Sequence, residues 1–325
     1  MAQTFTDLPL DELVDYRPAL DAPDDLDAFW SDTLAEARAA AGPTVLAEVS
    51  SPVRALHVRD LTFTGFGGDE IKGWVVRPHG DEELPAVVEF IGYGGGRGLP
   101  GEKSAWANAG YVHVIMDTRG QGSAWSVGDT PDPHGSAAAF PGVMTRGILD
   151  PRDYYYRRLY TDAARLIDEV SRLDGVDASR IAVTGGSQGG GLAIAAAALA
   201  GETVAALLPD VPFLADFPRA IVRTPLAPFT EITRFLSIHR DAEDAVLRTL
   251  SYVDGAILAR RITVPALFSV ALMDDIVLPS GVFASFHALQ SSDAAIEVYR
   301  YNGHEGGGYR HFMKQVAWLD ARFGR

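Results

Sequence analysis

A glycine-rich stretch around one serine is the part of the sequence whose residue types point most directly to chemistry. A β-branched run leads into Gly185-Gly186-Ser187-Gln188-Gly189, and an alanine-rich run follows. This spacing matches GxSxG, a strained strand-to-helix turn that exposes a serine oxygen at the top of a sheet. The glycines leave space in the turn, and the helix start favours negative charge near the serine. A plain glycine-rich turn that caps a helix can have the same sequence pattern, but the flanking strand and helix patterns favour a nucleophilic serine.

A serine nucleophile needs a base within hydrogen-bond reach and a third group that orients the base. Where this turn occurs, an acid and then a histidine follow the serine along the chain. Four of the eight histidines follow Ser187, namely His239, His287, His304 and His311. Only His304 directly follows a strand pattern, on a glycine-rich loop that can hold an imidazole above a sheet edge. We therefore predict His304 as the base, with a surface loop histidine as the alternative.

The orienting acid should lie at the end of the strand that precedes the histidine strand. Two candidates, Asp274 and Asp275, end the apolar run of residues 265–273. Asp274 is the first polar residue after the run, so its backbone is better fixed to point a carboxylate at His304. The spacing therefore favours Asp274 as the acid, with Asp275 as the alternative.

An attacked carbonyl becomes an oxyanion, which needs preorganised donors. The residue after the nucleophile, Gln188, offers one backbone amide. A second glycine run, 92–96, follows the strand pattern 86–91, and we predict the Tyr93 amide as the other donor. The glycines at 94–98 do not give the GxGxxG pattern followed by a helix and a ribose-binding acid, so dinucleotide binding is not expected.

Short apolar runs separated by glycine and proline turns indicate the elements that position these residues. The expected helices cover 160–173, 189–200, 282–290 and 312–323. The expected strands cover 56–63, 71–77, 86–91, 111–116, 181–184, 205–208, 266–270 and 296–301. Strands alternating with helices predict an α/β fold, a mostly parallel sheet with helices on both faces and ligands at the carboxyl ends of its strands.

We expect one domain over residues 1–325, because no linker of biased composition interrupts the chain. Residues 1–41 read as an appended helical extension, with a helix over 24–41. Residues 212–254 read as short helices inserted between strands, which predicts a lid over the site. Residues 120–160 read as a long ordered loop that buries its three consecutive tyrosines. Arg119 at its start is expected to link the sheet edge to this loop through guanidinium hydrogen bonds.

The composition excludes several classes of function. A formal charge of −15, from 28 basic and 43 acidic residues, argues against nucleic-acid and anionic-membrane partners. The absence of cysteine excludes disulfides and thiolate metal sites, and no other metal motif is present, so no cofactor is expected. The first residues lack a basic leader and an apolar run, and no stretch is long and apolar enough to cross a bilayer. We expect a cytoplasmic protein.

Several motifs together resemble a known family. They are RGQGS from Arg119, GGSQGG from Gly185 and HEGGG from His304, with MTRGILDPRDYYYRR and LSYVDG between them. The chain resembles carbohydrate esterase family seven, the acetyl xylan esterases and cephalosporin C deacetylases, over nearly its whole length. The resemblance implies the α/β-hydrolase fold.

The same resemblance implies roles for individual residues. Ser187 would be the nucleophile, Asp274 rather than Asp275 the acid, and His304 the base, with oxyanion donors on the Tyr93 and Gln188 amides. It also implies small acetylated substrates, such as xylo-oligosaccharides and cephalosporin C, and a homohexamer with an internal cavity. The alternatives are another short-chain carboxylesterase or an oligopeptidase on this fold, or a non-catalytic binding scaffold.

Overall fold

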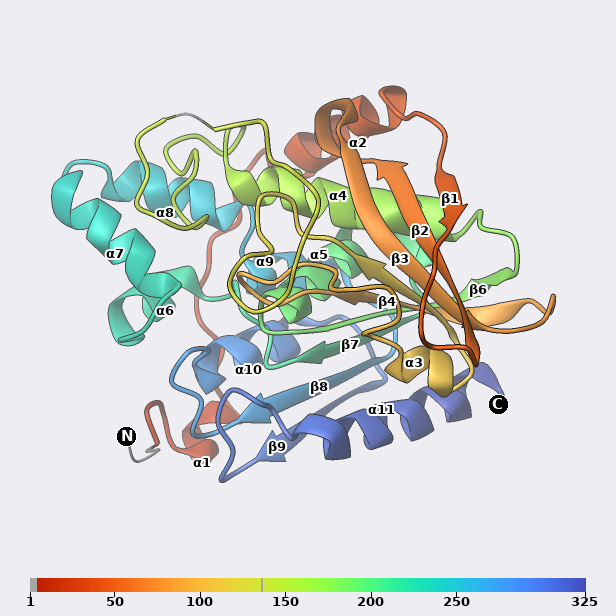
Figure 1. Cartoon of the computed structure of the whole chain (residues 1–325). Coiled ribbons are helices and arrows are strands. Elements are labelled where there is room, and N and C mark those ends of the chain that lie inside the picture. The colour runs from red at the N-terminus through yellow and green to blue at the C-terminus, as the bar shows by residue number, and fades with distance from the viewer. Residues whose placement is uncertain (1–4, 136) are drawn as a thin grey trace.

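A twisted sheet runs through the middle of the molecule (Figure 1). The computed structural model describes residues 5–135 and 137–325, so residues 1–4 of the predicted extension and residue 136 of the predicted loop lie outside it. In the described residues the sheet has nine strands in the order β1-β2-β3-β5-β4-β6-β7-β8-β9. β1, β2, β3 and β5 pair antiparallel in succession. From β5 across to β9 every pairing is parallel. The prediction of a mostly parallel α/β fold is confirmed.

The elements have the following bounds. The strands are β1 Val45–Glu48, β2 Leu56–Thr64, β3 Glu70–Pro78, β4 Leu84–Phe90, β5 Val112–Met116, β6 Val176–Gly186, β7 Ala206–Asp210, β8 Ala266–Ala271 and β9 Ala294–Tyr299. The helices are α1 Leu10–Leu13, α2 Leu26–Ala39, α3 Ala105–Asn108, α4 Tyr155–Val170, α5 Gln188–Ala200, α6 Phe217–Arg223, α7 Phe229–Ile238, α8 Glu243–Ser251, α9 Gly255–Leu258, α10 Pro279–Ala288 and α11 Gly308–Phe323.

Each predicted strand is present, with ends shifted by a few residues, but the prediction missed β1 and named no helix at α1, α3 or α9. β1 is a mostly exposed edge strand of four residues, which leaves little apolar pattern to read. The predicted loop over 120–160 was wrong at its end, because α4 begins at Tyr155 rather than Tyr160. Tyr155 and Tyr156 in the first turn of α4 are fully buried, so these aromatic residues do not alternate with exposed ones in the way that would mark a helix.

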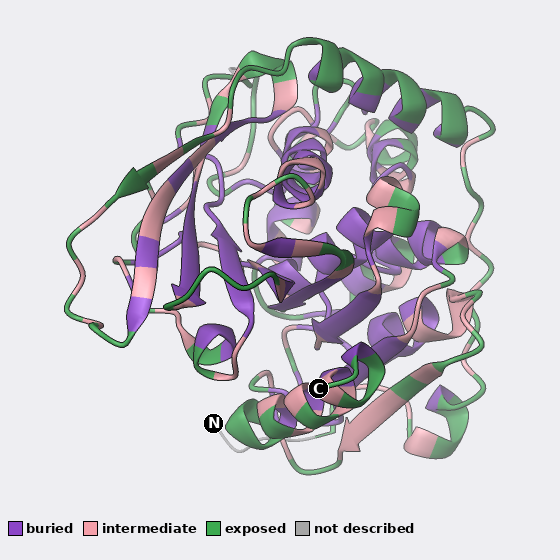
Figure 2. Cartoon of the chain, turned by 90° about the vertical axis from the view of Figure 1, so that its right-hand side faces the viewer, coloured by how far each residue is buried: buried purple, intermediate pink, exposed green. Residues whose placement is uncertain are grey.

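Helices cover both faces of the sheet, as predicted. One apolar core joins α4, α5, α9 and α10 to one face, and a smaller one joins α3 and α11 to the other. The strands between the layers are buried, whereas the outer faces of the surface helices are exposed (Figure 2). The α2 helix packs outside α4, where the Trp30 ring stacks on Tyr160 at 6.0 Å between centroids. In the described ranges, no helix is long and apolar enough to cross a membrane.

The short helices predicted in 212–254 are α6, α7 and α8, which extend from one side of the sheet (Figure 1). A buried carboxylate joins the two ends of this insertion. Asp254 accepts hydrogen bonds from the amides of Asp216 and Phe217 at the start and of Ala256 at its end, at 2.9–3.1 Å. The Gly255 amide also donates to the Leu214 carbonyl at 2.8 Å. The roles of the insertion as a lid and of 1–41 as an extension of one domain stay predictions.

The Asp254 carboxylate predicts a pH-dependent contribution to stability. Burial raises its pKa from 3.8 to about 6, although the three amide hydrogen bonds lower it. The folded protein therefore binds this proton more tightly than the unfolded chain, and the resulting stability is complete below pH 3.8 and lost as the pH rises through 6. The stability difference between wild type and Asp254→Asn should shrink by about 2 kcal/mol from pH 4.5 to 7. Urea unfolding measures it, and a constant difference would contradict the assignment.

Candidate active site

Ser187 lies in a strained turn between β6 and α5. Its φ and ψ are 57° and −121°, in a region that few residues other than glycine adopt. Two backbone hydrogen bonds hold the turn, from the Ser187 amide to the Asp210 carbonyl and from the Phe213 amide to the Ser187 carbonyl, both 2.9 Å. A Cβ on Gly189 would lie 2.1 Å from the Phe90 carbonyl oxygen, so this position requires glycine. The fold therefore enforces the strained turn that the sequence predicts, with Ser187 half-buried and lining a cavity.

The structure places Asp274, and not Asp275, against His304. The His304 Nδ1 lies 2.8 Å from the Asp274 Oδ2, across the parallel neighbours β8 and β9. The other carboxylate oxygen of Asp274 accepts hydrogen bonds from the Ile276 and Val277 amides, each 2.9 Å. Asp274 is 1% exposed, whereas Asp275 is exposed to solvent. Asp274 is thus fixed at one oxygen and presents the other to the imidazole.

Ser187 and His304 line the same cavity, which has a volume of about 530 Å³. The other histidines that follow Ser187 in the chain do not line it. His311 is buried and lies 3.0 Å from the Asp210 carboxylate. His287 contacts the Tyr16 carbonyl through its Nδ1 at 2.8 Å, and His239 stacks on Phe235. His304 is therefore the histidine that shares an open space with the serine.

The two amides predicted as oxyanion donors lie beside Ser187 at the carboxyl ends of β4 and β6. Gln188 is the first residue of α5, where amides lack an intrahelical acceptor. Tyr93 follows β4, and its amide has no acceptor among the described residues. Both Tyr93 and Ser187 line the cavity. Both amides are thus available to a developing negative charge.

The side chain of Tyr93 is anchored by the helical insertion. Its hydroxyl donates to the Glu231 carboxylate on α7 at 2.6 Å and accepts a hydrogen bond from the Val143 amide at 2.8 Å. Glu231 also accepts from the Met144 amide at 3.1 Å. Burial and the Glu231 charge both raise the pKa of the Tyr93 hydroxyl, so it stays a donor. The insertion therefore holds one of the predicted oxyanion residues in place.

A chain of buried amide groups links the two predicted donors. The Gln121 side chain accepts from the Gly94 amide at 2.6 Å and donates to the Gln188 side-chain oxygen at 2.9 Å. Gln188 in turn donates to the Ile91 carbonyl at 3.1 Å and accepts from the Tyr156 hydroxyl at 2.9 Å. The glycine loop after β4 is thereby tied to the start of α5.

Trp125 lies across the glycine loop. Its indole nitrogen donates to the Tyr93 carbonyl at 2.8 Å. A Cβ on Gly95 would lie 2.3 Å from the ring, so the glycine is needed for the indole to lie against the backbone. The glycine run therefore allows the backbone to turn and also leaves space for the Trp125 ring to pack beside Tyr93.

The contact between Gly95 and Trp125 predicts a selective loss of activity. Gly95→Ala should displace the indole, free the Tyr93 carbonyl and lower kcat/KM about 10- to 100-fold for the acetyl esters expected from the resemblance. Gly92→Ala is the matched control, because its Cβ would meet Trp125 at 3.5 Å, an ordinary contact. Steady-state kinetics and tryptophan fluorescence measure the two effects. Equal losses in both variants would contradict this role for Gly95.

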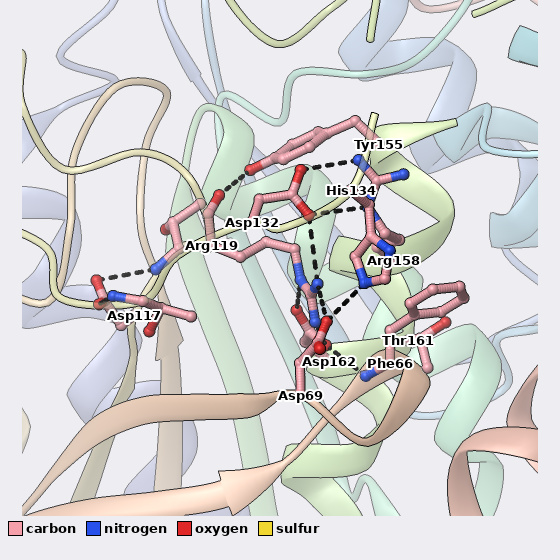
Figure 3. A network of polar contacts seen from close by, with 12 residues as sticks. Phe66, Asp69, Asp117, Arg119, Asp132, His134, Tyr155, Arg158, Thr161 and Asp162 are labelled. Atoms are coloured by element: carbon pink, nitrogen blue, oxygen red, sulfur yellow. Dashed lines mark hydrogen bonds and ion pairs between the residues drawn. The ribbon is translucent and has the colours of Figure 1, made fainter. Parts of the chain in front are cut away.

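The Arg119 side chain is fully buried and lies in a network of polar contacts with several aspartates (Figure 3). It makes two hydrogen bonds to Asp162, at 2.5 and 2.8 Å, and one to Asp69 at 2.9 Å. Asp132 lies 3.4 Å away and is bound by Arg158 at 2.8 and 3.0 Å. The predicted link from the sheet edge to the following loop is confirmed, and it also reaches α4 and the β2–β3 turn.

Breaking this cluster should destabilise the fold. In Arg119→Lys an ammonium cannot reproduce the planar fork that binds Asp162 and Asp69 together, so buried carboxylates lose partners. We expect the free energy of unfolding to fall by about 3 kcal/mol, measured by urea unfolding. Arg146→Lys is the control, because Arg146 is half-buried and 4.0 Å from Asp132. Similar losses in both variants would contradict a special role for Arg119.

Sequence reasoning did not assign a role at the site to Gln121, Trp125 or Glu231. Gln121 belongs to the RGQ motif, but its hydrogen bonds run to residues 27 and 67 positions away. Trp125 and Glu231 approach the glycine loop from a later loop and from the insertion. Of these three residues, only Gln121 could have been suspected from the sequence, because it belongs to the RGQ motif. No group of three or more potential metal ligands occurs in the parts of the chain that the structure describes.

Comparison with known proteins places the chain in a family. A family model described as acetyl xylan esterase (AXE1) matches residues 3–322. The chain belongs to the acetyl xylan esterase family. This membership makes it a carboxylic ester hydrolase with the α/β-hydrolase fold, as predicted.

Solved structures and a curated relative agree with this membership. The chain is similar to the acetyl xylan esterase from Paenibacillus sp. R4, at 37% identity and a TM-score of 0.90, covering 97% of this chain and 99% of that one. It is also similar to acetyl xylan esterase 1 from Thermoanaerobacterium sp. JW/SL YS485, at 33% identity and a TM-score of 0.88, covering 96% and 99%. The acetyl esterase Axe7A of Xylanibacter ruminicola is 24% identical over 270 residues, which span 81% of this chain and 60% of that protein.

Proposed function

We propose that this member of the family is a serine esterase that hydrolyses acetyl esters of small substrates through Ser187, His304 and Asp274. The observation that carries the proposal is the 2.8 Å contact between Asp274 and His304, whose imidazole shares a cavity with the strained Ser187. A buried acid, and a histidine and a serine that both line an open cavity, are the groups that nucleophilic acyl transfer requires. Acetylated xylo-oligosaccharides and cephalosporin C are the proposed substrates.

The reaction would proceed through an acyl-enzyme. The Ser187 Oγ attacks the acetyl carbonyl carbon while His304 Nε2 takes the hydroxyl proton. Asp274 holds the Nδ1–H tautomer and stabilises the imidazolium. The carbonyl oxygen becomes an oxyanion that accepts hydrogen bonds from the Tyr93 and Gln188 amides. The C–O bond to the alcohol then breaks, and His304 returns the proton to the leaving oxygen. Water repeats the sequence on the acetyl-serine and releases acetate.

The lining of the cavity supports a short acyl group. Val211, Ala227, Pro228 and Ile276 line it with apolar side chains. Val211 follows β7, Ile276 follows β8, and Ala227 and Pro228 come from the insertion before α7. An apolar wall of this kind suits a methyl group and offers it no polar partner. The names of the similar proteins, acetyl xylan esterase and acetyl esterase, agree with an acetyl donor.

The proposal predicts both a substrate preference and a dependence on Ser187. Wild type should hydrolyse p-nitrophenyl acetate faster than the butyrate and much faster than the octanoate. Ser187→Ala should lower kcat/KM for the acetate by about 10⁴-fold or more. Release of p-nitrophenol measures both. Unchanged activity in Ser187→Ala would remove Ser187 as the nucleophile, and an octanoate preference would remove the acetyl specificity.

A matched pair of variants tests the acid. Asn at position 274 can still accept from the Ile276 and Val277 amides, but its NH₂ group would face Nδ1 and favour the wrong tautomer of His304. Asp274→Asn should therefore lower kcat for the acetate by about 10³- to 10⁴-fold with KM little changed. The neighbouring Asp275→Asn removes the same charge and should stay within about threefold of wild type, as for other surface substitutions. The reverse ranking would assign the acid to Asp275.

A further inference from the structure

Among the side chains that line the cavity outside the proposed triad and the oxyanion donors, three lie on the side of β4 and β5 and carry polar or aromatic groups. They are Glu89, Lys103 and Trp125, and the Lys103 ammonium lies close to both of the others. The Lys103 Nζ lies 3.5 Å from the Glu89 Oε1 and 5.6 Å from the centroid of the Trp125 ring. They form a continuous strip of carboxylate, ammonium and aromatic ring, which we call the polar strip.

The order of strands places the polar strip on one flank of Ser187 and the apolar wall on the other. Ser187 follows β6, which lies between β4 and β7. Glu89 is on β4, Lys103 is in the loop between β4 and β5, and Trp125 follows β5. The apolar residues Val211 and Ile276 follow β7 and β8 on the opposite side. An ester centred on Ser187 thus meets the polar strip on one flank, and Val211, Ile276 and the Asp210 carboxylate on the other, so its two halves have different surroundings.

Glu89 is held as a carboxylate that faces the cavity. Its Oε2 accepts a hydrogen bond from Nε2 of the fully buried His113 at 2.8 Å, and its side chain is 23% exposed. Burial raises the pKa of Glu89, but the His113 hydrogen bond and the charges of His113 and Lys103 outweigh this and lower it to about 2. The Oε1 atom has only the long contact to Lys103, so it can accept a hydrogen bond from a ligand.

Lys103 and Trp125 complete the strip with a donor and a flat apolar face. The Lys103 ammonium has three N–H donors and one carboxylate contact, at 3.5 Å. The Trp125 side chain is 58% exposed although its indole nitrogen is already bonded to the Tyr93 carbonyl. An aromatic ring held by its edge offers its face for stacking.

The charges that line the cavity indicate which kind of alcohol can form the alcohol half of the ester. The lining holds three carboxylates, of Glu89, Asp210 and Glu305, against the single lysine Lys103. An anionic alcohol, such as the carboxylate-bearing alcohol half of cephalosporin C, would meet a net negative surface in a chain whose formal charge is −15, so its ester should be a poorer substrate than the ester of a neutral alcohol. An alkyl alcohol would cover the Glu89 Oε1 and the Lys103 ammonium without offering either of them a hydrogen bond. A neutral alcohol with several hydroxyl groups avoids both costs.

We propose that Glu89, Lys103 and Trp125 form the subsite for the alcohol half of the substrate, a neutral pyranose ring. The ring stacks on the indole of Trp125, one hydroxyl donates to the Glu89 Oε1, and a neighbouring hydroxyl accepts from the Lys103 ammonium. Hydrogen bonds to charged groups are stronger than neutral ones, so the strip sets specificity for the sugar. This inference rests on the proposed esterase activity and assigns specificity residues to it.

The test compares two esters that share the acetyl group. The probes are mono-acetylated methyl β-xyloside and ethyl acetate, which lacks both ring and hydroxyls. The measured quantity is the ratio of kcat/KM for the sugar ester to that for ethyl acetate. Glu89→Gln and Lys103→Met should each lower this ratio about tenfold or more, mainly through a higher KM for the sugar ester. Gln at 89 can still accept from His113, and Lys103→Met leaves that contact untouched, so the pair separates subsite loss from misfolding.

Glu83→Gln is the matched control, because this exposed residue precedes β4 at the end away from the site and loses the same charge. Its ratio should equal that of wild type. An unchanged ratio in both Glu89→Gln and Lys103→Met, with Ser187-dependent hydrolysis intact, would overturn the subsite and leave the esterase standing. Faster hydrolysis of an acetylated methyl glucuronide than of the neutral xyloside would show an anion site and overturn the neutral-sugar assignment. Failure to hydrolyse any acetyl ester would overturn both proposals.

Discussion

The buried guanidinium of Arg119 is the interaction on which much of the active region depends. A buried charge must be paired, and Arg119 satisfies this through Asp162 on α4 and Asp69 in the β2–β3 turn. Its own carbonyl accepts a hydrogen bond from the Tyr155 hydroxyl at 2.6 Å. Two residues later, Gln121 bonds both the Gly94 amide and the Gln188 side chain. An electrostatic constraint near the carboxyl end of β5 thus helps to fix the backbone that carries the predicted oxyanion donors.

The parallel part of the sheet explains why groups far apart in sequence meet at one cavity. Tyr93, Ser187, Asp274 and His304 each follow the carboxyl end of a different strand, and these ends share one edge of the sheet. Ser187 stores backbone strain there, which the hydrogen bonds of neighbouring strands and the close packing of glycine backbones sustain. The insertion contributes Glu231 to hold Tyr93 and supplies part of the apolar wall.

The sequence predicted the elements that repeat an apolar pattern and missed those that do not. The strands from β2 to β9 were found because their residues are apolar and bounded by turns. The β1 strand was missed because most of its residues are exposed and give no apolar pattern. The start of α4 was missed because its consecutive tyrosines are all buried, so apolar residues do not recur there at helical spacing. The tyrosines were expected to pack, and they do, but their hydroxyls also support Arg119 and Gln188.

By itself, the sequence determined the class of fold and predicted Ser187 as the candidate nucleophile. GxSxG between a strand and a helix is a local pattern, so adjacent residues are enough to predict the strained turn. It limited the candidates for the acid to Asp274 and Asp275 and the candidates for the base to four histidines. The order of residues along the chain and their positions after predicted strands favoured Asp274 and His304. Only the tertiary structure decided that Asp274 faces His304 and that Glu89, Lys103 and Trp125 share a surface. Such contacts depend on the direction of side chains across separate elements, and that direction follows from strand register and loop paths rather than from spacing along the chain.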